Sequence, residues 1–264
     1  MATYRLDLTY EGTRFKGWAR QPDQRTVQHE VERVLTTVLG EPARLRVAGR
    51  TDAGVHALAQ VASFDSRAAL DCRRLRLALN ALLPEDVAVT AVSPAPDGFD
   101  ARSSTARTYR YRLWVSPVRP VAERLWVWNP RGAVDTDVLV ATAPLLVGHR
   151  DFAALTPSAH LYRSCVRHVL RAEWRPAVCA APVPAAAAAS LANAGMAGVW
   201  EFEIMAGSFL HNMVRVAVGS MVDMAQGRMT VDQFRAALES GERRLMGQTA
   251  PARGLALVAV DYGR

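Results

Sequence analysis

The chain has 264 residues, half of them apolar and 22% charged, which suits one large or two small globular domains. Its net charge is +7, which favours a polyanionic partner such as nucleic acid. Arginine supplies almost all of the positive charge because Lys16 is the only lysine, a choice that a GC-rich genome also explains. Three cysteines without a C-x-x-C pair argue against a disulfide framework and fit a reducing, cytoplasmic location.

The first part of the chain predicts alternating strands and helices. Residues 4–10 alternate apolar and polar side chains, which is the period of a half-buried strand. Thr26 begins a helix whose apolar stripe ends at Gly40. The other elements predicted here are a strand near Leu45, a strand at 59–64, a helix at 72–82 and a strand at 87–92. The resulting order, β-α-β-β-α-β, is the split βαβ pattern.

A similar order is predicted to recur after a loop-rich join at 94–104. The elements predicted in this part are strands at 107–115, 165–174, 199–205 and 255–262, and helices at 135–147, 209–226 and 231–239. We therefore predict an α+β fold of two ferredoxin-like halves, residues 1–104 and 105–264. Each half is expected to have an antiparallel sheet flanked by helices, with an active-site cleft between the halves.

Two segments bear on membrane targeting. The first seven residues include Arg5 and Asp7 and lack the apolar core of a signal peptide. Residues 176–200 carry no charge, but Pro182, Pro184 and many weakly apolar alanines make a poor spanning helix. We expect an inserted loop there and no membrane partner.

Residues 49–57 read Gly-Arg-Thr-Asp-Ala-Gly-Val-His-Ala and are called the signature loop below. Its glycines allow a sharp turn that presents the side chain of Asp52. A cation such as Arg50, two positions earlier, would keep this carboxylate ionised, as a carboxylate nucleophile requires. The spacing alone is more often that of an Asx-turn, with Asp52 bonded only to the backbone. His56 is more readily explained as a residue that anchors the loop than as a catalyst.

The signature loop resembles the catalytic signature of the tRNA pseudouridine synthase A family. Further blocks carry the resemblance along nearly the whole chain, at residues 10–13, 15–18, 106–111, 148–152, 209–215, 253–255 and 258–262. Two positions depart from the family pattern: Glu11 stands where aspartate is more usual, and Ala19 where glutamine is usual. Neither position is one of the expected site residues.

The resemblance implies an isomerase that converts uridine to pseudouridine in the tRNA anticodon stem-loop, at positions 38–40, without a cofactor. Asp52 would be its nucleophile, attacking either C6 of the base or C1′ of the sugar. Arg50 would fill the gap left by the extruded nucleotide or hold its phosphate, and Leu255 would form an apolar wall. The resemblance also implies a homodimer that binds tRNA across both subunits.

Two further site residues each have a simpler explanation. The resemblance places Tyr109 against the flipped base, whereas the strand pattern alone places it in the core. Arg215 lies in an apolar helix, where Asp52 is an available partner, although an arginine at the edge of a helix would look the same. Exposed arginines that could contact phosphates are Arg73, Arg74, Arg76, Arg110 and Arg112.

Other classes of function fit parts of the sequence. A noncatalytic RNA-binding module would explain the charge but has no use for an isolated carboxylate, and the RNP motif is absent. A nucleotide-phosphate enzyme is suggested by Gly49 and Gly54, but no Lys-Ser/Thr follows to complete a Walker motif. His160, Cys165 and His168 lack a fourth ligand for zinc, so no metal is expected.

Overall fold

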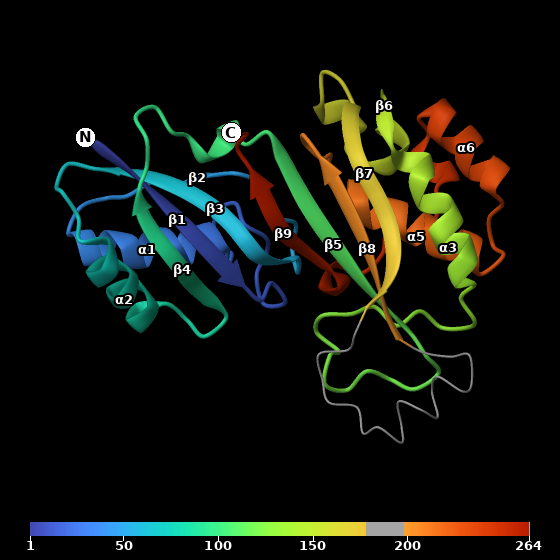
Figure 1. The fold of residues 1–264 in the computed structure, drawn as a ribbon, viewed down its shortest axis with the longest axis horizontal. Coiled ribbons are helices and arrows are strands. Elements are labelled where there is room, and N and C mark those ends of the chain that lie inside the picture. The colour runs from blue at the N-terminus through green and yellow to red at the C-terminus, as the bar shows by residue number, and fades with distance from the viewer. Residues whose placement is uncertain (178–197, 264) are drawn as a thin grey trace. The chain divides into compact units, whose positions relative to one another are not determined.

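The computed structural model describes residues 1–177 and 198–263 (Figure 1). Most of the predicted insertion at 176–200 lies outside the described residues. The predicted α+β class is confirmed, because the strands pair mostly antiparallel and helices flank them. The chain divides into two compact units, Met1–Arg107 with Ala256–Arg264, and Thr108–Leu255, called the first and second unit below.

The first unit is built on strands in the order β4-β1-β3-β9, with the short β2 also paired to β3. Its elements are β1 (Ala2–Tyr10), α1 (Val27–Leu39), β2 (Arg46–Val47), β3 (His56–Ser66), α2 (Cys72–Leu82), β4 (Val87–Pro94) and most of β9 (Leu255–Asp261). The apolar side chains of β1 are buried at every second position, as their alternation predicts. Gly40 ends α1 in the left-handed conformation, and α2 packs on β4 and α1.

The second unit contains strands in the order β5-β8-β7-β6, and Figure 1 shows α3, α5 and α6 grouped beside β7. Its elements are most of β5 (Ala106–Val115), α3 (Thr136–Thr142), β6 (Gly148–Asp151), β7 (Val166–Ala177), β8 (Gly198–Ala206), α5 (Met213–Ala225) and α6 (Val231–Ser240). Every residue of α5 except Arg215 is buried, as in a helix at the centre of a globular core. Among the described residues, no helix has both the length and the apolar character needed to cross a bilayer.

Two predicted elements of the second unit differ from the structure, and one of its strands was not predicted. The helix predicted from residue 209 begins at Met213, because Asn212 at its N-cap takes a left-handed φ of 60°. The helix predicted to 147 leaves the α conformation after Thr142 and continues as a 3₁₀ turn containing Pro144, whose ring cannot donate an amide hydrogen bond. The strand β6 was not predicted, since it is short and mostly exposed and so has no apolar alternation.

The last strand is grouped differently from the predicted halves. The sequence places all of residues 105–264 in one half. In the structure, β9 pairs in parallel with β3, at His56 with Ala256 and at Ala57 with Leu257. Residues from Ala256 onward therefore belong to the first unit, next to the strand that follows the signature loop.

An ion pair between β2 and β3 makes stability depend on pH in acid. Arg46 donates to both carboxylate oxygens of Asp65, at 2.7 and 2.9 Å, and Thr3 donates at 2.7 Å. These bonds lower the pKa of Asp65 to about 2. A carboxyl group with a lowered pKa contributes stability that is complete above its unfolded pKa of about 4 and is lost as the pH falls through about 2.

We expect Asp65→Asn to lower the free energy of unfolding by about 1 kcal/mol near pH 7, a value reduced because both partners are partly exposed. Urea unfolding at a series of pH values should show this difference shrinking below about pH 4. The exposed Asp97 provides the control, since Asp97→Asn should change little at any pH. A difference that stays constant down to about pH 2 would contradict the assignment.

Candidate active site

A buried polar cluster holds the start of the signature loop. The hydroxyl groups of Tyr10 and Thr51 share a hydrogen bond of 2.7 Å. Gln60 donates to the Tyr10 hydroxyl at 3.2 Å and to the carbonyl of Gly49 at 2.7 Å. All three side chains are buried, and burial raises the pKa of Tyr10 to about 12, so its phenol stays protonated at neutral pH. A satisfied buried network of this kind favours a single loop conformation.

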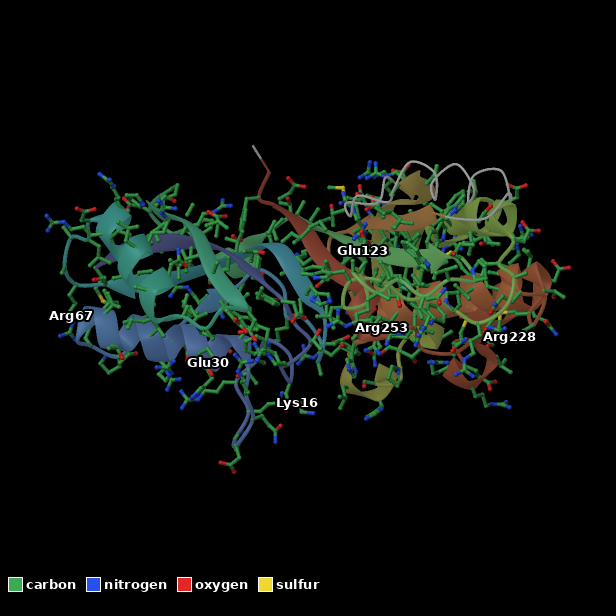
Figure 2. The ribbon with its side chains drawn as sticks, turned by 90° about the horizontal axis from the view of Figure 1, so that it is seen from below. Lys16, Glu30, Arg67, Glu123, Arg228 and Arg253 are labelled. Carbon is green, nitrogen blue, oxygen red and sulfur yellow. The ribbon has the colours of Figure 1, made fainter. Side chains whose placement is uncertain are left out.

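The N-terminal loop, residues 11–18, binds the signature loop through its backbone. The amide of Trp18 donates to the carbonyl of Thr51 at 3.0 Å, and the amide of Gly54 donates to the carbonyl of Phe15 at 3.2 Å. Lys16 on this loop is exposed and points away from the sheet of the first unit (Figure 2). The block 15–18 of the sequence therefore supports the segment that carries Asp52.

Two glycines allow these loops to approach so closely. A Cβ atom on Gly12 would lie 2.1 Å from the carbonyl oxygen of Val55. A Cβ atom on Gly17 would lie 2.8 Å from the carbonyl oxygen of Thr51, and Gly17 also has a φ of +92°. Both obstacles are backbone atoms, so neither can be relieved by a change of rotamer. No local pattern in the sequence reveals the role of these glycines, because their partners, Val55 and Thr51, are distant in the chain.

His56 anchors the far end of the signature loop, which confirms its predicted role. Its side chain is fully buried, and its Nδ1 accepts a hydrogen bond from the amide of Gly12 at 2.9 Å. A ring nitrogen that accepts this bond carries no proton, so Nε2 bears the hydrogen of the neutral ring. The carboxylate of Glu11 lies 3.4 Å from the same Nδ1.

Arg107 fixes the residue that precedes the signature loop. Its guanidinium donates to the carbonyl of Ala48 through Nε at 2.9 Å and through Nη2 at 2.6 Å. It also donates to the carbonyl of Ser104 at 2.9 Å. This role of Arg107 is not predicted from the sequence, where the residue only forms part of the block 106–111. The signal that could have identified Arg107 is that it is a half-buried arginine in a strand. The N–H donors of such a guanidinium must find hydrogen-bond acceptors inside the protein.

Asp52 and Arg50 occupy different positions on this braced loop. The side chain of Asp52 is half-buried, and its backbone carbonyl accepts a hydrogen bond from the amide of Val55 at 3.1 Å, which closes a tight turn. The turn includes Gly54 at a φ of +77°. Arg50 is exposed. The loop therefore presents one carboxylate on a rigid support.

The predicted residues Tyr109 and Arg215 lie in the second unit. Tyr109 is 7% exposed, and its ring packs edge-on against Phe209 with 5.0 Å between centroids. Arg215 donates through Nε to the carbonyl of Ala250 at 2.8 Å and through Nη1 to Oδ1 of Asn212 at 2.7 Å. Asn212, at the N-cap position of α5, thus orients the arginine through its side chain. These contacts explain why the block 209–215 combines aromatic and polar residues.

Leu255 is set in place by the residue before it. A Cβ atom on Gly254 would lie 2.5 Å from the ring of Tyr111, so only glycine allows this approach. The hydroxyl of Tyr111 donates to the carbonyl of Pro251 at 2.8 Å, and burial raises its pKa well above the usual value. Leu255 follows at the start of β9 and is buried.

Two arginines predicted as phosphate contacts are instead paired inside the second unit. Arg110 lies 3.2 Å from Glu203 and 3.4 Å from Glu201, and Arg112 lies 3.2 Å from Glu123. All three carboxylates are buried, with at most 9% exposure. Because the charges of Arg110 and Arg112 are matched by these carboxylates, the structure does not support them as phosphate contacts.

The chemistry available at the first unit is that of a carboxylate. In the described part of the chain, no three His, Cys, Asp or Glu side chains are grouped so as to hold a metal ion, and this includes His160, Cys165 and His168. A half-buried carboxylate on a rigid loop can act as a nucleophile or as a general base. Which of these it does depends on the substrate.

Comparison with known proteins shows which family the chain belongs to. A family model described as tRNA pseudouridine synthase matches residues 8–102 and 142–263, which include the signature loop and the blocks around Arg215 and Leu255. Relatives named tRNA pseudouridine synthase A match the chain from end to end. The protein from Geotalea uraniireducens is 36% identical over 263 residues, covering 99% of this chain and all of that protein.

Two further relatives have higher identity. The tRNA pseudouridine synthase A of Solidesulfovibrio magneticus is 41% identical over 273 residues, covering all of this chain and 92% of that protein. That of Nitratidesulfovibrio vulgaris is 40% identical over 291 residues, covering 99% of this chain and all of that protein. The chain therefore belongs to the tRNA pseudouridine synthase family, a family of isomerases.

Proposed function

We propose that this protein isomerises uridine to pseudouridine in tRNA with Asp52 as the nucleophile. The observation that carries the proposal is the support of this carboxylate. Three features restrain the short segment that carries Asp52. They are the buried cluster of Tyr10, Thr51 and Gln60, the close approach of Gly12, and the hydrogen bonds from Arg107 to the carbonyl of Ala48. A rigid segment is needed where one side chain must be held within a few tenths of an ångström of the position from which it reacts.

The reaction rearranges bonds without a net gain or loss of atoms. The N1–C1′ bond breaks, the uracil turns, and C5 bonds to C1′, while C5 loses a proton and N1 gains one. A carboxylate nucleophile can divide this change into two easier steps by bonding either to C1′ or to C6 and then leaving. The detached uracil must be held throughout, which requires stacking and apolar surfaces near Asp52.

We assign that holding role to residues of the second unit. Tyr109 would stack on the base, Leu255 would form an apolar wall, and Arg215 would support the carboxylate. Arg50 would fill the gap left by the extruded nucleotide, which costs a few kcal/mol of stacking to expose. This arrangement requires two ferredoxin-like halves with an active-site cleft between them, and we include that arrangement in the proposal.

The proposed substrate and assembly follow the family. The names of the relatives support tRNA as the substrate, and the net charge of +7 suits a polyanion. We propose the anticodon stem-loop, at positions 38–40, as the target. We also propose that the protein is a homodimer and acts in the cytoplasm.

Mapping pseudouridine in cellular tRNA tests this function. We expect tRNA from cells that lack the protein to lose pseudouridine at positions 38–40 and at no other position. Mass mapping after a pseudouridine-specific label would show the loss, and the gene for the parent chain should restore the modification. Unchanged pseudouridine at these positions in a strain without any other source would contradict the proposal.

A further inference from the structure

A pocket lined by arginines lies beside the signature loop in the first unit. It has a volume of about 370 Å³, at the lower end of the range of about 300–1,000 Å³ that is usual for ligand pockets. Four arginines line it, Arg46, Arg50, Arg102 and Arg107, together with Trp18, Gln28, Leu45 and residues 47–49. We call this feature the arginine pocket.

The charge around the arginine pocket is only partly compensated. Arg46 pairs with Asp65 at 2.7 Å, and Arg102 pairs with Asp100 at 2.6 Å. Neither aspartate is among the residues that line the pocket, and no other described residue that lines it is acidic. Arg50 is exposed and belongs to none of the ion pairs of the described residues, so its charge adds to the excess. The pocket therefore attracts an anion.

A second pocket in the first unit provides a comparison. It has a volume of about 350 Å³ and includes Arg20, Arg33 and Arg44, but its wall also contains Glu32. That carboxylate is buried, lies 3.3 Å from Arg44 and accepts the backbone amide of Leu45 at 2.9 Å. The wall of this second pocket thus contains a carboxylate that pairs with Arg20 and Arg44, whereas the described residues that line the arginine pocket include no carboxylate.

The side chains favour a phosphate as the anion. The guanidinium group is planar and carries paired N–H donors, which can bind two oxygens of one phosphate. Arg50 and Arg102 are exposed, so the pocket is open to a phosphate that belongs to a longer chain. Its wall also includes Ala48 and Gly49, which lead directly into Asp52. A phosphate held there would lie within a few residues of the proposed nucleophile.

We propose that the arginine pocket binds a backbone phosphate of the substrate RNA next to the target nucleotide. This inference rests on the proposed function for the identity of the RNA. By binding one phosphate, the pocket fixes the register of the RNA strand on the protein. That register determines which nucleotide is extruded toward Asp52. Arg102 is a phosphate ligand in this scheme, and Asp100 holds its guanidinium in position.

The test compares Arg102→Gln with Arg44→Gln, because both arginines are exposed and each is paired with a carboxylate. Binding of an unmodified tRNA transcript is measured over a salt series. We expect Arg102→Gln to weaken binding by about tenfold and to lower the slope of log K against log salt by about one. Arg44→Gln should bind like the parent. Thermal unfolding of both variants checks that they remain folded.

Ethylation interference locates the phosphate. Transcripts with randomly ethylated phosphates are sorted into bound and unbound fractions by each protein. We expect one or two phosphates beside the target uridine to interfere with binding to the parent, and this interference to disappear with Arg102→Gln. Equal binding by the two variants, or an interference pattern that Arg102→Gln leaves unchanged, would overturn the proposal. Neither readout needs turnover, so a failure here is distinct from a failure of the isomerase assignment.

Discussion

The variant Asp52→Asn should lose at least about 10³-fold in turnover, which corresponds to about 4 kcal/mol in the activation barrier. Asparagine keeps the shape of the side chain, so the brace around the loop should hold. Its amide cannot form the covalent bond that a carboxylate nucleophile provides. Single-turnover conversion of tRNA uridine at saturating enzyme measures the loss directly.

Binding of tRNA to Asp52→Asn should stay within about threefold of the parent. Affinity for RNA comes mainly from contacts between cations and phosphates, and a carboxylate supplies none of these. A matched control is Asp7→Asn, because Asp7 is also half-buried in the first unit but pairs with Arg5 at 2.6 Å on β1. That control should turn over like the parent. Turnover of Asp52→Asn within tenfold of the parent would refute the nucleophile assignment.

Local patterns in the sequence predicted most of the elements. The alternation in residues 4–10 identified β1, and the cap and stop signals identified α1 and α2 to within a residue or two. These features depend on neighbours in the chain, which the sequence displays directly. The turn around Asp52 was also predicted, since its glycines mark the positions that need unusual backbone angles.

Features that depend on distant partners could not be predicted. The pairing of Arg110 with Glu203 requires β5 and β8 to be neighbours in the sheet, which no local pattern reveals. The left-handed Asn212 looks like an ordinary residue in an apolar run, so the start of α5 was placed too early. Arg107 likewise needs Ala48, 59 positions away, before its role becomes visible.

The loop that carries Asp52 depends both on local sequence patterns and on contacts with distant parts of the chain. The sequence points to Asp52 as the proposed nucleophile, because the signature loop that contains it resembles the catalytic signature of the family. The structure adds why that residue is held still, through a segment that begins with Gly12 and is distant in the chain. A site built this way should be sensitive to changes that remove no chemical group at all.

Gly12→Ala should therefore impair the enzyme as severely as the loss of a functional group. The added Cβ would lie 2.1 Å from the carbonyl oxygen of Val55, and both atoms belong to the main chain. Relief requires one loop to move, which would also strain the bond from the Gly12 amide to His56. We expect turnover to fall at least about 100-fold, together with a loss of about 1–3 kcal/mol in stability, as overpacking usually costs.

The matched control for this prediction is Gly198→Ala, where the added Cβ would meet no atom of residues 1–177 and 198–263 within 4 Å. Thermal unfolding, tRNA binding and single-turnover rates are measured for both variants. Gly12→Ala should unfold at a lower temperature and lose turnover even below its unfolding temperature, whereas Gly198→Ala should resemble the parent. This pattern separates the brace from the nucleophile, since Asp52→Asn should lose turnover without losing stability. If Gly12→Ala unfolds and turns over like the parent, the close approach of the two loops does not position Asp52.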